Sequence, residues 1–227
     1  MSKASKRLVE AKGKVDNTKA YNVAEAVKLV KETSKVKFDA SVEMHFHLGI
    51  DPKKGEQVVR GSVVMPNGIG KTKRIAVFTT PAHEKEAKEA GADIVGGKEL
   101  IESIKKDGKC DFDIAVAVPE IMKDLSAIAK TLGQKGLMPN PKTGTVTGDV
   151  KGAVAEIKKG KIDFKNDDTA NVHAMVGKVS FEDSKLEQNI RALLDAVKRA
   201  KPDTVKGTFI ESCYINSTMG PGVKIQL

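Results

Sequence analysis

The longest period-two pattern in the chain covers residues 36–50, and it constrains the fold more than any other stretch. Its apolar members alternate with charged and polar side chains, and they are Val36, Phe38, Ala40, Val42, Met44, Phe46, Leu48 and Ile50. Such alternation predicts a β-strand with one face on a core and a polar opposite face. Because ordinary strands have about 5–6 residues, we expect the first part of the run to be a loop or a bulge.

The two ends of the chain carry the remaining signals of an α+β domain. The elements expected there are helices at 1–20, 22–32 and 184–201, strands at 58–65, 161–165 and 172–181, and a final hairpin. Asn22 is a candidate N-cap of its helix, and Gly61 is a possible bulge in its strand.

Strand and helix signals alternate in the middle of the chain. The expected strands are 75–79, 93–95 and 112–118, and the expected helices are 81–90, 98–106, 119–132 and 149–159. The near-continuous apolar run at 112–118 is typical of a strand inside a parallel sheet. This succession predicts a parallel sheet that is covered by helices.

These patterns predict two domains. Residues 1–67 plus 160–227 would form a split α+β sandwich domain, and residues 68–159 would form an inserted Rossmann-like α/β domain with a parallel sheet. Glycine and proline mark the two short crossings, near 66–70 and at Gly160, which favours a hinge between the domains.

Charge points toward a polyanionic partner. The chain of 227 residues has a formal net charge of +9, and lysine greatly outnumbers arginine. Lysine suits phosphates, whereas arginine suits bidentate reading of bases. Aromatic residues make up only 4%, which argues against binding by many stacked bases. If the partner is a nucleic acid, we therefore expect recognition of shape and backbone.

Other features bear on the cellular location. Cys110 and Cys213 form no CxxC pair, which favours a reducing compartment and no structural metal. No apolar run reaches the roughly 20 residues of a membrane span, and residues 1–7 precede no apolar signal segment. We expect a cytoplasmic protein without membrane contact.

Candidate phosphate loops fail on their spacing. The stretch Gly68-Ile69-Gly70-Lys71-Thr72 has Met65 where GxxxxGK[ST] needs glycine, and GxGxxG fails because residue 73 is lysine. A glycine-rich hinge is the better interpretation. The alternative of a nucleotide-using enzyme centred on the inserted domain stays open, as does that of a non-specific basic DNA-binding protein.

Titratable residues give no positive sign of catalysis. His45 and His47 lie on one strand face, but no cysteine or acidic cluster has ligand spacing, so we expect solvated histidines and neither metal nor cofactor. Asp111 and Asp113 are interpreted as solvated strand-edge charges, and the pair at 167–168 as part of a turn. The lysine-bearing loop 133–148 is either functional or a solvated crossover.

The stretch 217–222 joins the last two predicted strands. Pro221 and Gly222 fit the central positions of a type II turn. Before them, Thr218 is suited to a ribose hydroxyl or phosphate, Met219 to packing on a base or sugar, and Gly220 to close backbone approach. A plain hairpin turn is the alternative.

Several stretches together resemble the ribosomal protein L-one family, in its bacterial form. They are Lys37-Phe38-Asp39, Val42-Glu43, Leu48-Gly49-Ile50-Asp51-Pro52, Val59-Arg60-Gly61, Ala90-Gly91-Ala92-Asp93, Val95-Gly96-Gly97, Gly136-Leu137-Met138-Pro139-Asn140-Pro141-Lys142, Val176-Gly177-Lys178, Lys206-Gly207-Thr208 and Thr218-Met219-Gly220-Pro221. The match runs essentially the whole chain, and the proline-rich loop and the Thr-Met-Gly turn are its specific signals.

The resemblance implies a non-enzymatic constituent of the large ribosomal subunit, monomeric when free. It implies that the split domain binds large-subunit rRNA at the mobile stalk, that the protein assists release of exit-site tRNA, and that it represses its own operon by binding its mRNA. By similarity, the rRNA-binding residues would be Lys37, Phe38, Ser41, Glu43, Asp167, Thr169, Ser212, Thr218, Met219 and Gly220.

Overall fold

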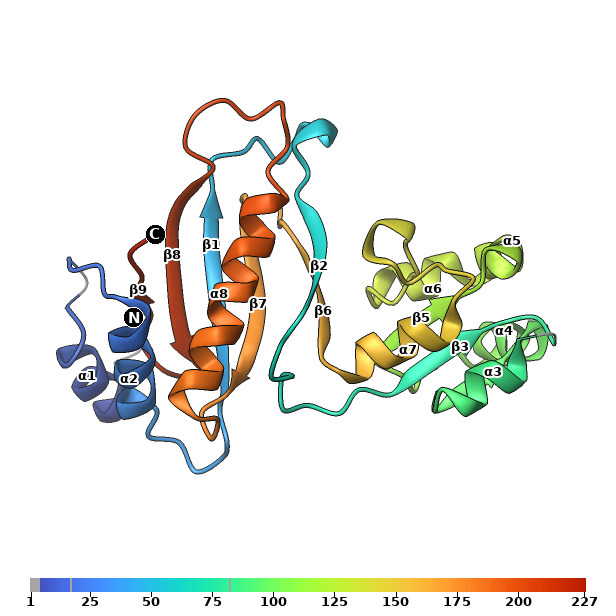
Figure 1. Cartoon of the computed structure of the whole chain (residues 1–227), viewed down its shortest axis with the longest axis horizontal. Coiled ribbons are helices and arrows are strands. Elements are labelled where there is room, and N and C mark those ends of the chain that lie inside the picture. Colours follow the sequence, from blue (N-terminus) through green and yellow to red (C-terminus); the bar gives the residue numbers. More distant parts are fainter. Residues whose placement is uncertain (1–4, 17, 82) are drawn as a thin grey trace. The chain divides into compact units, whose positions relative to one another are not determined.

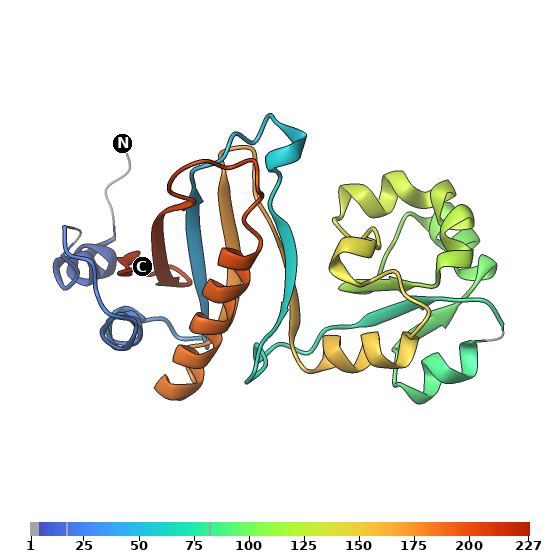
Figure 2. The same ribbon diagram turned by 45° about the horizontal axis from the view of Figure 1, so that its top comes forward.

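The computed structural model describes residues 5–16, 18–81 and 83–227. The chain divides into two compact units (Figures 1 and 2). Met1–Gly70 and Ile162–Leu227 form the first, called here the split unit, and Lys71–Lys161 form the second, called the inserted unit. The chain thus passes from the split unit to the inserted unit after Gly70 and returns after Lys161. The sequence patterns predicted these two boundaries after residues 67 and 159.

The split unit is built on an antiparallel sheet with the strand order β7-β1-β8-β9, and β2 and β6 form a separate pair. Its strands are β1 Ser41–Leu48, β2 Arg60–Val64, β6 Lys161–Lys165, β7 Asn171–Lys178, β8 Ile210–Ser217 and β9 Val223–Lys224. Its helices are α1 Lys6–Gly13, α2 Val23–Thr33 and α8 Asp183–Arg199, with a 3₁₀ turn at Gly55–Gln57.

Helices cover one face of this sheet. The apolar side chains of β1 and the stripe of α8 share one buried cluster with residues of α2, and its members include Val27, Val30, Val42, Met44, Phe46, Leu48, Leu186, Ile190, Leu193 and Val197. At about 25 cal/mol per Å² of apolar surface, this burial is the main force that holds the sheet and helices together. The opposite sheet face carries the polar residues of β1, as the alternation predicts.

The period-two run becomes a strand only in its second part. Residues 34–40 form a loop, and β1 begins at Ser41. Phe38 is accordingly 55% exposed in that loop and does not join the core. Gly61 lies within β2, where a Cβ atom would come 2.7 Å from the ring of Phe164, so this position favours a residue without a side chain.

The inserted unit is a three-stranded parallel sheet with the order β4-β3-β5 and helices on both faces. Its strands are β3 Ile75–Phe78, β4 Ile94–Gly96 and β5 Ile114–Ala117. Its helices are α3 Glu84–Glu89, α4 Lys98–Asp107, α5 Met122–Leu125, α6 Ala129–Gln134 and α7 Val150–Lys158. Alternate residues of β3 enter two different cores, one toward α4–α6 and the other toward α3 and α7. The predicted fold class is confirmed.

Two helices of the inserted unit differ from expectation. The predicted helix 119–132 is divided into α5 and α6 by a 3₁₀ turn at Ser126–Ile128, where the Ser126 hydroxyl donates to Lys123 O at 2.6 Å and competes with the helical ladder. The predicted helix 81–90 begins only at Glu84, after a turn in which the His83 N–H donates to Thr80 O. Its residue 82 lies outside the described residues.

The loop 133–148 is partly packed against the sheet. The Ala117 N–H donates to Thr145 O at 2.9 Å, and the Thr147 N–H donates to Ala117 O at 3.1 Å. These two bonds place Val146 beside Ala117 of β5 in a parallel bridge. Thr143 and Thr145 are buried and bonded to each other. Residues 143–147 of this loop are therefore not a solvated crossover.

Asp113 is a solvent-exposed charge directly before β5, as expected. Its carboxylate accepts from the Arg74 N–H at 3.0 Å at the start of the parallel sheet, and this bond holds the pKa of Asp113 below its usual range. Asp149 caps α7 through the Gly152 N–H. No helix in the described part of the chain has the length and apolar character of a membrane span.

Candidate nucleic-acid interface

Three neighbouring strands present polar side chains on the sheet face opposite the helices, called here the open face. Its residues follow from the strand register, because Glu43, His45 and His47 of β1 each have a partner on β7 and on β8, and Ser41 has one on β7. From one end to the other, the rows are Asn171–His47–Ser212, His173–His45–Tyr214, Met175–Glu43–Asn216 and Lys178–Ser41. The open face therefore combines segments that lie more than a hundred residues apart in the sequence.

A tight turn borders one end of the open face. The Thr218 N–H donates to Ser41 O at 2.9 Å, and the Thr218 hydroxyl accepts from the Ser41 N–H at 3.2 Å. The Gly220 N–H then closes the turn on Ser217 O at 2.7 Å. Met219 is left 69% exposed, with a φ of 66°. The turn thus presents an apolar side chain beside Ser41 and is tied to β1 through Thr218.

The predicted type II turn at Pro221–Gly222 is wrong. The positive φ lies at Met219, whereas Gly222 is not among the described glycines with positive φ. The bonds between Thr218 and Ser41 place the chain reversal at residues 217–220, before the Pro221-Gly222 pair at which the local sequence predicts it. Gly220 is needed for close packing, because a Cβ atom there would lie 2.4 Å from the Ser217 Oγ.

A second turn, between β6 and β7, borders the other end. The Asp167 carboxylate accepts from the Thr169 N–H at 2.8 Å, the Asn171 N–H at 2.7 Å and the Thr169 hydroxyl at 2.8 Å. The bond from the Asn171 backbone is the main cause that holds the pKa of Asp167 far below its usual range. Asp167 is therefore a fixed anion at this edge, in agreement with the predicted turn.

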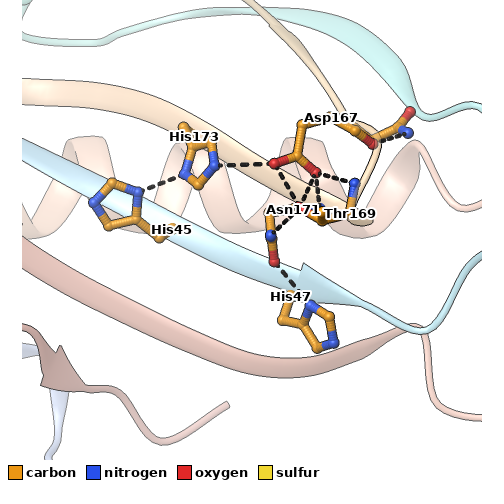
Figure 3. Close-up of polar contacts among 7 residues, drawn as sticks. His45, His47, Asp167, Thr169, Asn171 and His173 are labelled. Carbon is orange, nitrogen blue, oxygen red and sulfur yellow. Dashed lines mark hydrogen bonds and ion pairs between the residues drawn. The ribbon is translucent and has the colours of Figure 1, made fainter. Parts of the chain in front are cut away.

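His45 and His173 lie side by side next to the turn at Asp167 (Figure 3). His45 Nδ1 lies 2.7 Å from His173 Nδ1, and His45 Nε2 lies 2.9 Å from the Asn216 Oδ1. His173 Nε2 is in turn 3.5 Å from the Asp167 carboxylate. The sequence predicts solvated histidines but does not identify this pair, because strands far apart in sequence bring the two rings together.

His47 makes a separate set of contacts beside the pair. Its Nδ1 lies 2.8 Å from the Asn171 Oδ1, and its Nε2 lies 3.6 Å from the Glu211 carboxylate. Among the described residues, no three His, Cys, Asp or Glu side chains are placed to hold a metal ion. These histidines are therefore hydrogen-bonding groups of the open face.

The rRNA-contact candidates fall into two groups. Ser41, Glu43, Thr218, Met219 and Gly220 lie at or near one end of the open face, and Lys37 and Phe38 lie in the loop that leads into β1 at this end. Asp167, Thr169 and Ser212 lie at the other end. Six residues of β1 separate the ends, which corresponds to about 20 Å of extended chain.

The sequence patterns missed the residues between these two groups, namely Asn171, His173, Tyr214 and Asn216. The alternation in β1 places His45 on the polar face, but it does not identify the partners on β7 and β8. Only the pairing of the strands supplies that information, since a shift of one residue would turn the partners to the opposite face.

The chain was then compared with known proteins. The model of the Ribosomal protein L1p/L10e family matches residues 30–221. Large ribosomal subunit protein uL1 of Mycoplasma capricolum subsp. capricolum is 53% identical over 226 residues, which is 100% of both chains. The uL1 protein of Mesoplasma florum is 52% identical over 227 residues with the same coverage. That of Macrococcus caseolyticus is 52% identical over 225 residues, 99% of this chain and 97% of its own.

Proposed function

Because the chain belongs to the Ribosomal protein L1p/L10e family and is a structural constituent of the large ribosomal subunit, we propose that its open face binds large-subunit rRNA at the mobile stalk. Proteins of this family are structural and not enzymes, which excludes the nucleotide-using enzyme considered above. Their place in the cell is the ribosome, in the cytoplasm.

One observation carries this proposal. Candidate residues from four separate segments, at 37–43, 167–169, 212 and 218–220, border or lie on the sheet face opposite the one on which the described helices of the split unit pack. A face formed from such distant segments is rigid, because each strand is held by two neighbours or by a turn bonded to β1. Rigid polar surfaces are suited to folded RNA, whose shape and 2′-hydroxyl groups they can match.

The mixed charges of this face favour a contact that matches one RNA surface over a non-specific attraction to phosphates. Glu43, Asp167 and Glu211 lie on it or at its edge, together with Lys178 and Lys224. Carboxylates accept hydrogen bonds from ribose hydroxyls and base amino groups, so they select a particular RNA surface. Lysines elsewhere on the chain supply the general attraction to phosphates through counterion release.

The further roles follow from the family resemblance. We propose that the protein assists the release of deacylated tRNA from the exit site, and that it represses its own operon through an mRNA site that resembles the rRNA site. Both RNAs would use the same open face. An excess of stalk rRNA should therefore displace the operon mRNA completely, and simultaneous binding of both RNAs would contradict a shared face.

A matched pair of lysine and arginine variants tests the rRNA proposal. Lys37→Ala removes a cation near the open face, and Arg191→Ala removes one from the exposed side of α8, so both variants have the same net charge. With a stalk rRNA fragment, we expect Lys37→Ala to lower the slope of log K against log salt by about one, while Arg191→Ala leaves it unchanged.

Competition with duplex DNA completes this test. A fitted contact with 2′-hydroxyl groups predicts that structured RNA is strongly preferred. Equal slopes for the two variants, or equal affinity for duplex DNA and the rRNA fragment, would support the non-specific basic DNA-binding alternative instead.

A further inference from the structure

We propose that a cavity in the inserted unit binds an extended protein segment that carries lysine or arginine side chains. The cavity has a volume of about 840 Å³, and its lining residues come from the segments that follow β3, β4 and β5. It therefore lies beyond the carboxyl ends of the parallel strands. Crevices at this edge of a parallel sheet are the usual ligand sites of α/β folds, with volumes of about 300–1,000 Å³.

Part of the lining is apolar. Val95 and Leu100 contribute to it, and both are only partly buried. A Cβ atom on Gly97 would come 3.0 Å from Thr79 O and 3.9 Å from the Ile121 side chain, so the glycine keeps open the space between the segments after β3 and β5. Apolar surface of this kind suits the methylene stems of lysine and arginine, whose charged ends reach outward to polar groups.

The charged groups of the lining are mostly acidic. They are Glu84 of α3, Lys98 and Glu99 of α4, and Glu120 and Asp124 after β5. The Lys98 Nζ lies 3.6 Å from the Asp124 Oδ2, so the lysine already pairs with one of the carboxylates. Glu84, Glu99 and Glu120 have no ion-pair partner among the residues that the structure describes. Three carboxylates are thus available to a cationic occupant.

This charge distribution excludes phosphate-bearing occupants. Four carboxylates and one ammonium group give the described lining a net charge of −3, whereas the whole chain has a net charge of +9. RNA phosphates and nucleotides are repelled by such a lining, although the chain as a whole attracts them. Ammonium and guanidinium groups instead form charge-assisted hydrogen bonds with carboxylates.

Hydrogen-bonding groups of the lining distinguish a peptide from a simple cation. The backbone N–H groups of Lys98, Glu99 and Leu100 have no acceptor in the described part of the chain, and Gly97 supplies no capping side chain. These donors match the carbonyl groups of a peptide, which a polyamine lacks. Thr80 also lines the cavity, and its buried hydroxyl has no partner among the described residues, whereas buried hydroxyls ordinarily have one. The occupant therefore combines acceptors with cations.

Titration of the full chain with short peptides tests this proposal, with nitrogen-15 NMR as the readout. The basic probe is an extended octapeptide of alternating lysine and threonine, and its counterpart has glutamate in place of lysine. We expect the basic peptide to shift the amide signals of residues 96–100 and 120–124, and the acidic peptide to leave them unchanged. No shift of these signals at about 1 mM basic peptide would overturn the proposal.

Two double variants with the same net charge locate the contact. Glu99→Gln with Glu120→Gln should lower the affinity for the basic peptide about tenfold, because each exposed ion pair contributes a factor of up to about five. Glu89→Gln with Asp107→Asn alters exposed carboxylates outside the lining and should leave the affinity unchanged. Equal affinities of the two double variants would overturn this site.

Two small ligands test the class of occupant. Spermidine offers cations without carbonyl acceptors, and ATP offers phosphates. We expect spermidine to bind at least about tenfold more weakly than the basic peptide, and ATP to leave the signals of residues 96–100 unchanged. Spermidine that binds as tightly as the peptide, or ATP that shifts these signals, would overturn a peptide as the occupant. None of these measurements depends on rRNA binding by the open face, because the cavity lies in the inserted unit.

Discussion

Ala170 and Met219 are non-glycine residues with positive φ, at 63° and 66°, and they lie at opposite ends of the open face. Such backbone conformations cost about 1 kcal/mol or more for residues with a side chain, and they collect at functional sites. Neither position was predicted from the sequence. The strain therefore supports, independently of the motif, a functional role for the two turns that border β7 and β8.

Replacing Met219 should separate stability from RNA binding. Met219→Gly removes an exposed side chain and relieves the positive φ, so we expect the free energy of unfolding to stay the same or rise by up to about 1 kcal/mol. The affinity for stalk rRNA should fall about tenfold through loss of an apolar contact. Urea unfolding and RNA titration measure the two effects. A variant that binds RNA normally would remove Met219 from the proposed interface.

The turn at Asp167 should make stability depend on acid pH. Because the folded-state pKa is lowered from the ordinary value of 3.8, ionised Asp167 stabilises the fold above that pH, and the contribution is lost as the pH falls through the folded-state pKa. We expect Asp167→Ala to lower the urea midpoint equally at pH 7 and pH 5.5, and by less below about pH 4.

Asp168→Ala is the control for this effect, since Asp168 is the exposed neighbouring carboxylate. Its urea midpoint should match the wild type throughout. A difference between Asp167→Ala and the wild type that stays constant down to pH 3 would show that the turn does not depend on the charge of Asp167.

Among the elements, α8 is attached to the sheet by a buried polar residue as well as by its apolar stripe. Asn189 is fully buried; its amide donates to Gly68 O and Val176 O, both at 2.8 Å, and its Oδ1 accepts from the Asn67 N–H at 3.2 Å. One side chain thus joins α8, β7 and the segment that leads toward Gly70.

Replacing Asn189 by leucine should destabilise the split unit by about 2–3 kcal/mol, because buried carbonyl groups lose their donors. Both tyrosines of the chain, Tyr21 and Tyr214, lie in the split unit, and tryptophan is absent, so tyrosine fluorescence in urea follows this unit alone. Gln188→Leu, at the exposed neighbouring position, should change the stability by less than about 0.5 kcal/mol. Equal effects of the two variants would contradict the role given to Asn189.

How far the sequence predicts the structure differs from element to element. The side-chain alternation of β1, the parallel sheet and the cap at Asn22 depend on local patterns, and all three were predicted. The turn at Met219 and the pairing of His45 with His173 were not predicted. Both depend on hydrogen bonds between residues more than 120 positions apart, which local periodicity does not contain.

For the whole molecule, the division into units predicts where RNA affinity resides. We expect a chain in which residues 71–161 are replaced by a flexible glycine linker to bind stalk rRNA within about threefold of the full chain, because distant, independent sites contribute additively within about 0.5 kcal/mol.

Substitutions in the full chain control for misfolding of the shortened one. Lys85→Ala and Lys105→Ala in the inserted unit should bind like the wild type, in contrast to Lys37→Ala. A loss in these variants as large as that of Lys37→Ala would show that the inserted unit contributes directly to RNA binding.

The position of β1 between β7 and β8 also has a consequence for synthesis of the protein. Translation produces β1 about 170 residues before β8, which at 5–20 residues per second is an interval of roughly 10–35 s. For about the first 130 of these residues, until β7 is made, the strand has neither of its two neighbours, and its apolar side is not covered by α8. The inserted unit, whose residues are consecutive, can complete its own sheet in the meantime. A nascent chain that stalls before β7 would consequently expose a long unpaired strand, the kind of segment that chaperones protect from aggregation.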